Sequence, residues 1–269
     1  QPAITYGLRG IAYFELHLQG PKQDLHSGSF GGAVNNPAVA LAKLLAKLID
    51  DRGRVQLPGF YDAVQPLEDA ERQMWAGLDF SDANFAKQLG VDGLLGEEGF
   101  STLERRWARP TFDVHGLWSG YQGQGGKTII PAKAGAKISF RLVPKQTPET
   151  VAQQLRQFVA ENTPPGIAIE VRDLHGGPGL VVDPHSPYIA AAQQAIDTAF
   201  GKSAVLIREG GSIPIVAQMV EQLGADVLLL GWGMDDDGAH SPNEKFSIQD
   251  YFQGIRASSH LWYALAQID

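Results

Sequence analysis

The sequence predicts two domains of mixed helix and strand: an antiparallel α+β domain and a smaller α/β domain with a parallel-type sheet. Segments in the first two thirds of the chain alternate apolar and polar residues, as half-buried strands do. After residue 179, helix and strand patterns alternate, which indicates parallel βαβ units. A chain of 269 residues is long enough for one or two such domains.

Composition excludes several classes of protein. The net charge is −8 and no basic stripe is present, which argues against a nucleic-acid partner. The absence of cysteine excludes disulfides, thiolate metal ligands and thiol nucleophiles. No apolar run approaches the ~20 residues of a membrane span, and no signal peptide is visible, so we expect a cytoplasmic protein without a membrane partner. Because the chain starts at Gln1 without methionine, we expect a fragment.

The first domain begins with an alternating strand over residues 8–18. A helix follows, capped by Asn36 with Pro37 in its first turn, and Gly53 is expected to end it. Residues 54–110 show no repeat and many aromatics, and we interpret them as an insertion with two short helices.

Further strands are predicted near 111–118 and 135–143, then a helix capped by Thr147 and a strand over 167–171. The resulting order, β-α-(insertion)-β-β-α-β, is a ferredoxin-like split βαβ unit.

In the second domain we expect a helix from the cap Ser186 to Gly201, strands over 204–207 and 226–230, and a final helix that starts at Ser247. Another helix carries an apolar stripe: Val216, Met219, Val220 and Leu223. With only two strong strands, this domain looks like part of a larger sheet.

An acidic loop, Asp235 to Glu244, follows the second of these strands. Open α/β sheets place their chemistry at this carboxyl edge. An imidazole beside carboxylates is also a metal environment, so His240 is a candidate metal ligand. The alternative is a solvated acidic loop.

Other candidates are ambiguous on their own. Arg141, on the polar face of its strand, suits either a surface ion pair or a substrate carboxylate. Ser212 lies outside any nucleophile elbow and either caps a helix or contacts substrate. Thr128 ends a Gly-Lys-Thr run that is no phosphate loop, because Tyr121 stands where the opening glycine is required. That loop could still clamp an anionic or carbonyl group. His26 is interpreted as a loop donor and His17 as solvated. The other four histidines outside the acidic loop are interpreted as structural: His115, His175, His185 and His260.

Six segments in this order carry a family resemblance: Thr5–Gly10, Asp24–Gly28, Lys127–Pro131, Phe140–Pro144, Arg208–Pro214 and His240–Glu244. On these motifs the chain resembles the co-catalytic zinc metallopeptidases of family M20, in the branch of cytosolic non-specific and carnosine-type dipeptidases. The resemblance implies a lid domain at residues 6–178, which forms a homodimer. It also implies a catalytic domain to which residues 1–5 and 179–269 contribute the C-terminal portion.

The resemblance also implies roles for individual residues. His240 would be a metal ligand, and His26 would stabilise the oxyanion in the partner's active site, with Thr128 beside it. Arg141 would hold the carboxylate of a dipeptide or small peptide. Gly210, Gly211 and Ser212 would form a substrate-contacting loop, and Glu209 is left with a structural ion pair.

In such an enzyme two zinc (or manganese) ions are bound per subunit, mostly by segments that precede the lid. These segments and the general base are not in this sequence, so we expect the chain alone to bind metal weakly or not at all. We also expect it not to hydrolyse peptides. Two alternatives are a non-catalytic dimerisation or binding module, and a deacylase of N-acyl amino acids resembling succinyl-diaminopimelate desuccinylase. The long insertion at 54–110 favours the dipeptidase.

Overall fold

A computed structural model describes residues 1–234 and 236–268. Its contacts divide the chain into two compact units. Unit 1 comprises residues 1–8, 181–209 and 218–269, and unit 2 comprises residues 9–180 and 210–217. The expected assignment of residues 6–178 to a lid, and of the rest to a catalytic domain, stays a prediction.

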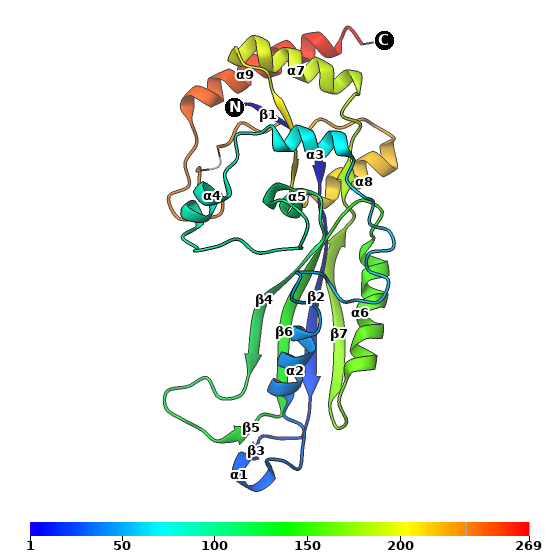
Figure 1. The fold of residues 1–269 in the computed structure, drawn as a ribbon, viewed down its shortest axis with the longest axis vertical. Coiled ribbons are helices and arrows are strands. Elements are labelled where there is room, and N and C mark those ends of the chain that lie inside the picture. The colour runs from blue at the N-terminus through cyan, green and yellow to red at the C-terminus, as the bar shows by residue number, and fades with distance from the viewer. Residues whose placement is uncertain (235, 269) are drawn as a thin grey trace. The chain divides into compact units, whose positions relative to one another are not determined.

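Unit 2 is built on a four-stranded sheet with the order β4-β6-β2-β7, in which every neighbouring pair is antiparallel (Figure 1). The strands are β2 (Gly10–Gln19), β4 (Thr111–Ser119), β6 (Lys133–Leu142) and β7 (Ala168–Gly177). This arrangement is the ferredoxin-like order that the sequence predicts.

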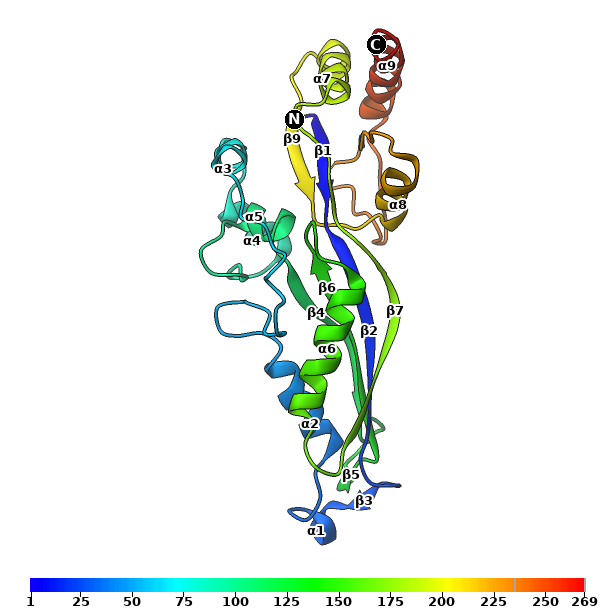
Figure 2. The same ribbon diagram turned by 90° about the vertical axis from the view of Figure 1, so that its right-hand side faces the viewer.

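One face of this sheet is covered by α2 (Pro37–Ala46) and α6 (Pro148–Asn162), which run beside the strands in Figure 2. The predicted alternation puts Phe14 and Leu16 of β2 and Phe140 of β6 into one core with both helices. Asn36 and Thr147 cap the helices with their side chains, as expected.

The expected end of α2 at Gly53 is wrong, because the helix stops at Ala46 and is capped by Lys47. Gly53 instead lies in a turn in which its amide donates to the carbonyl of Asp50. Its φ is +72°, and a Cβ there would lie 2.6 Å from the carbonyl carbon of Gly96. Glycine is therefore required by this turn and not by the helix.

The insertion contains three short helices, α3 (Asp69–Ala76), α4 (Asp82–Leu89) and α5 (Thr102–Trp107). The first two are predicted by the sequence, and the third is not. A capping box between Ser101 and Glu104 starts α5, although the helix is only 6 residues long.

A two-stranded ribbon in unit 2 consists of β3 (Leu25–His26) and β5 (Ile129–Ile130), and α1 (Ser27–Phe30) follows β3 directly. Figure 1 shows this ribbon near the end of β2 that carries Gln19.

Unit 1 contains a three-stranded sheet in the order β8-β1-β9, with β1 and β9 parallel. Its strands are β1 (Ala3–Leu8), β8 (Leu180–Val181) and β9 (Val205–Glu209). Helix α7 (Pro187–Phe200) is capped by Ser186 and ends at the left-handed Gly201, as predicted, and it packs against α9 (Ile248–Leu265).

One expectation for the second domain is wrong. Residues 226–230 form no strand, and only Leu229 makes a bridge, to Thr5. Strands β8 and β9 already flank β1, which limits what Leu229 can pair with. Helix α8 (Pro214–Leu223) forms as predicted; in its apolar stripe Val216 and Val220 are half-buried, whereas Met219 and Leu223 are exposed. No helix of the described ranges is long and apolar enough to cross a membrane.

Candidate substrate-binding site

Arg141 and Ser212 lie together in unit 2. Arg141 stands near the end of β6, opposite Ile11 of β2 and Thr111 of β4. Its Nη1 donates a hydrogen bond of 2.9 Å to Oγ of Ser212. A hydroxyl that accepts a bond keeps its own hydrogen to donate, and a guanidinium has further donors in a planar fork. The pair can therefore offer several donors to one carboxylate.

The backbone that carries Ser212 is held at both ends. Nε of Arg9 donates to the carbonyl of Gly210 at 3.1 Å. A Cβ at residue 210 would lie 2.7 Å from the carbonyl oxygen of Arg106, so only glycine fits there. Beyond Ser212, Pro214 packs so closely on Gly177 that a Cβ on this glycine would lie 2.7 Å from it. Gly211 is exposed, whereas Gly210 and Ser212 on either side of it are half-buried.

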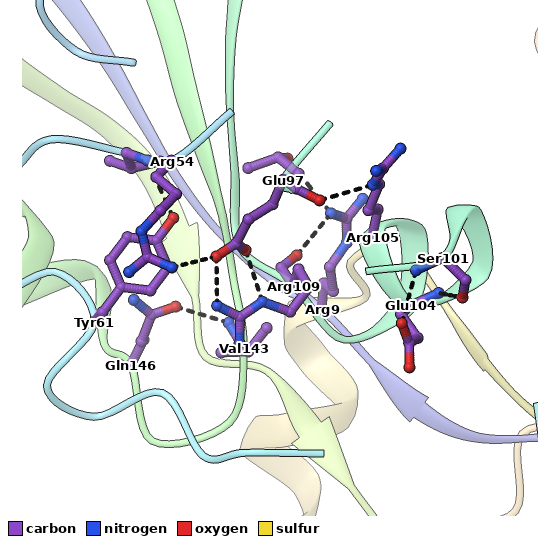
Figure 3. A network of polar contacts seen from close by, with 12 residues as sticks. Arg9, Arg54, Tyr61, Glu97, Ser101, Glu104, Arg105, Arg109, Val143 and Gln146 are labelled. Carbon is purple, nitrogen blue, oxygen red and sulfur yellow. Dashed lines mark hydrogen bonds and ion pairs between the residues drawn. The ribbon is translucent and has the colours of Figure 1, made fainter. Parts of the chain in front are cut away.

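A buried ion-pair network lies beside this loop (Figure 3). Glu97, only 3% exposed, accepts two parallel hydrogen bonds from Arg109, of 2.7 and 2.8 Å, and a third of 2.6 Å from Arg54. Burial raises the pKa of Tyr61, over whose ring the Arg54 guanidinium lies at 4.0 Å. Such bidentate pairs fix geometry as well as charge.

Sequence reasoning missed Arg9 and this network. Arg9 is the one residue between β1 and β2, and Nη1 donates to the carbonyl of Arg109 at 3.2 Å and to Oγ1 of Thr111 at 3.4 Å. No local pattern links Arg9 to residues about a hundred positions away. The strand predicted over residues 8–18 includes Arg9, so no local signal marked it as a junction between two strands.

His26 and Thr128 lie side by side at the ribbon. His26 pairs with Ile129, and the amide of Ser27 donates to the carbonyl of Thr128 at 3.0 Å. Nδ1 of His26 accepts from the amide of Gly28 at 3.1 Å. Because Nδ1 is an acceptor, the neutral ring carries its hydrogen on Nε2, and the imidazole is exposed. It is therefore available as a donor to a group outside unit 2.

These two pairs are separated by the length of the sheet. Ile11 is opposite Arg141, whereas Gln19, at the other end of β2, is opposite Lys133 and bonds Ala132 next to the ribbon. At 3.4 Å per residue, the step from Ile11 to Gln19 spans roughly 27 Å. Within one copy of unit 2, His26 and Arg141 therefore lie at opposite ends of the sheet.

His240, in unit 1, is exposed and has a φ of +63°, which non-glycine residues rarely adopt. Two nearby carboxylates, Asp236 and Asp237, already have partners. Lys245 Nζ lies 2.9 Å from Asp236, which lowers the pKa of that carboxyl, and 3.3 Å from Asp237. Asp237 also accepts from the amide of Met234 at 2.7 Å. Asp235 lies outside the described residues.

Within the described ranges, no three histidine, aspartate or glutamate side chains gather where they could hold a metal ion. A catalytic zinc takes three protein ligands. The described residues therefore do not fit a zinc site by themselves, and His240 contributes at most one ligand.

Three other histidines contact neighbouring side chains, whereas the structural interpretation of the exposed His185 and His260 stays a prediction. His17 donates to Glu15 at 2.9 Å and meets Trp118 edge-on, so the interpretation of it as merely solvated is wrong. Tyr13 is stacked between the rings of His115 and His175.

The family described as "Peptidase dimerisation domain" matches residues 6–167. The chain therefore belongs to the M20 peptidase dimerisation family, as its motifs suggest.

Three relatives illustrate the similarity. The Cys-Gly metallodipeptidase DUG1 of Candida albicans is 38% identical over 95% of this chain and 53% of its own. The crystal structure of human carnosine dipeptidase 1 is 32% identical, with a TM-score of 0.81 over 100% of this chain and 57% of its own. The metallo-carboxypeptidase Sso-CP2 from Sulfolobus solfataricus is 32% identical, with a TM-score of 0.88 over 98% and 61%. The chain spans about half the length of the curated relatives it matches.

Proposed function

We propose that this chain is the lid and the C-terminal portion of the catalytic domain of a homodimeric metallopeptidase that hydrolyses dipeptides or C-terminal peptide bonds. Its named relatives are metallodipeptidases and a metallo-carboxypeptidase. The observation that carries the proposal is the placement of the Arg141–Ser212 and His26–Thr128 pairs at opposite ends of one sheet.

In this proposal, Arg141 and Ser212 hold the carboxylate at the end of the substrate. A planar guanidinium and a hydroxyl donor recognise a carboxylate well, and an amide much less. Gly210 and Gly211 carry Ser212 without side chains that would block the ligand. This selects peptides whose scissile bond lies close to a free carboxyl end.

His26 would act in the active site of the partner subunit. Its Nε2 hydrogen would donate to the carbonyl oxygen as negative charge develops there, and Thr128 would flank the same group. Donors aimed at a developing oxyanion supply ~3–4 kcal/mol of transition-state stabilisation. Because roughly 27 Å of β2 lies between the strand position opposite Arg141 and the end of the strand beside the ribbon, each active site would need both chains.

The described residues do not make a metal site, so we propose that two zinc (or manganese) ions are bound by the complete enzyme, with His240 as one ligand. The chain alone would bind metal weakly and would not hydrolyse peptides. Purified chain supplied with zinc or manganese should show no turnover on a dipeptide panel. Robust turnover that is abolished by His240→Ala would contradict this part of the proposal.

The shared active site is tested by mixing two inactive variants of the complete enzyme, His26→Ala and Arg141→Met. A mixed dimer contains one site with both defects and one with neither. Subunit exchange should therefore restore about a quarter of wild-type dipeptidase activity, since half the dimers regain one of two sites. Absence of any recovery, with mixed dimers shown by native mass spectrometry, would contradict action in trans. Turnover of N-acyl amino acids without turnover of dipeptides would contradict the substrate class.

A further inference from the structure

Arg9 connects three segments of unit 2 that are far apart in the sequence. Nε bonds the carbonyl of Gly210 at 3.1 Å, and Nη1 bonds the carbonyl of Arg109 at 3.2 Å. Nη1 also lies 3.4 Å from Oγ1 of Thr111. One side chain therefore bonds the Ser212 loop, the end of the insertion and the start of β4.

The contacts with Gly210 and Thr111 lie next to Ser212 and Arg141, respectively. Gly210 is two residues from Ser212, and Thr111 is the cross-strand neighbour of Arg141. A planar guanidinium presents its donors at fixed angles, so bonds to both sides limit how far the loop can shift from the strand. The 2.9 Å bond between Arg141 and Ser212 requires that alignment.

The third contact connects this alignment to a rigid support. Arg109 is 6% exposed, and Glu97 holds its guanidinium by two parallel hydrogen bonds. Figure 3 shows Arg9 beside Arg109 and the Glu97 network. The carbonyl that Arg9 bonds therefore belongs to a residue whose side chain is fixed in the interior.

We propose that Arg9 is a positioning residue for carboxylate binding, which aligns the 210–212 loop with Arg141 and uses the Glu97–Arg109 pair as its support. This inference rests on the proposed role of Arg141 and Ser212. In this inference Arg9 acts through the loop, since its described bonds to Gly210, Arg109 and Thr111 go to protein oxygens.

The test uses the purified 269-residue chain and two probes, glycylglycine and glycylglycinamide, which differ at the terminal carboxylate. Affinity for each is measured by NMR titration of the Ser212 amide in wild type, Arg9→Lys, Arg9→Met and Arg141→Lys. Arg54→Lys is the matched control, since Arg54 also bonds Glu97 but none of its described contacts reaches the loop. Thermal unfolding checks that every variant is folded.

Wild type should prefer glycylglycine. Both Arg9 variants should weaken glycylglycine binding about tenfold, a size expected for loss of a charged hydrogen bond, and leave the amide unaffected. Their Ser212 amide signals should shift before ligand is added. Arg54→Lys should lower the melting temperature and keep the preference.

The role of Arg9 alone would be overturned if Arg9→Lys and Arg9→Met are both folded, keep the wild-type preference for glycylglycine over the amide, and show no shift of the Ser212 signal. A wild-type chain with no preference for the acid, or an Arg141→Lys variant that keeps it, would overturn the carboxylate site itself. The two failures are therefore distinguishable. An equal loss in Arg54→Lys would show a general effect of stability and would also overturn the positioning role.

Discussion

Glu97 and Arg109 face each other in the interior of unit 2, joined by hydrogen bonds of 2.7 and 2.8 Å. Each is almost inaccessible to solvent, and Arg54 adds a third bond to the same carboxylate. The pair holds Arg109 at the end of the insertion, and Arg9 bonds both the carbonyl of Arg109 and the carbonyl of Gly210 in the Ser212 loop.

Glu97→Gln should destabilise the chain strongly. The change leaves a buried arginine without its counter-charge, which costs about 3–5 kcal/mol. Glu170→Gln is the matched control, because Glu170 forms a similar two-bond pair with Arg172 on the surface, where solvent screening leaves such pairs little effect on stability. Urea unfolding measures both variants. Equal losses in the two would contradict a dominant role for burial.

Arg141→Lys should raise the KM of the complete enzyme for dipeptides. Lysine keeps the charge but loses the planar fork, and we expect a rise of about 10- to 100-fold with a smaller change in kcat. Arg156→Lys serves as the control, since Arg156 pairs with Asp173 on the surface. Steady-state kinetics on one dipeptide separate the two parameters. A large fall in kcat at unchanged KM would argue against ground-state carboxylate binding.

Gly210→Ala should disturb the loop without a change in charge. The new methyl would lie 2.7 Å from the carbonyl oxygen of Arg106 and 2.8 Å from Nη2 of Arg9, so the backbone must move. We expect weaker glycylglycine binding by the chain and a lower melting temperature. Gly93→Ala adds the same methyl where no atom lies within 4 Å, and it should be close to neutral. Normal binding by Gly210→Ala would mean that the loop tolerates displacement.

Glu15 should contribute to stability in a way that depends on pH. Its hydrogen bond with His17, and then the charge of Lys137, hold the pKa of its carboxyl below the ordinary value. A lowered pKa gives stability that is present above the unfolded-state pKa, about 4.3, and is lost as pH falls through the folded-state pKa. The difference in unfolding free energy between wild type and Glu15→Gln should therefore shrink towards pH ~3.

Carbon-13 NMR of the Glu15 carboxyl checks the direction of this shift. A midpoint at or above that of a model peptide would contradict it. His17→Gln should move the midpoint upward, because it removes the largest cause of the shift.

The parts of the fold that depend on local pattern could be predicted from the sequence. The alternation in β2 and β6, and the caps at Asn36, Thr147 and Ser186, are local signals, and the elements form where expected. Residues 226–230 have the composition of a strand, but a strand also needs a neighbouring strand with a free edge. Because β8 and β9 flank β1, Leu229 forms only a single bridge, to Thr5.

The candidate site was predicted as separate residues and not as an arrangement. Motif positions pointed to Arg141 and Ser212, but nothing local states that residues 71 positions apart share a hydrogen bond. The partners of the acidic-loop carboxylates could not be predicted for a related reason. Asp236 and Asp237 look unpaired in the sequence, whereas Lys245, nine and eight positions later, forms an ion pair with each of them.

The uninterrupted run of β2 has a consequence for how such an enzyme would be regulated. Under the roles proposed for Arg141 and His26, which lie at opposite ends of the sheet, an isolated copy of the chain would contain no complete active site. Catalytic activity would then depend on the fraction of copies that are in dimers. Turnover per copy would therefore fall on dilution, even when every copy stays folded.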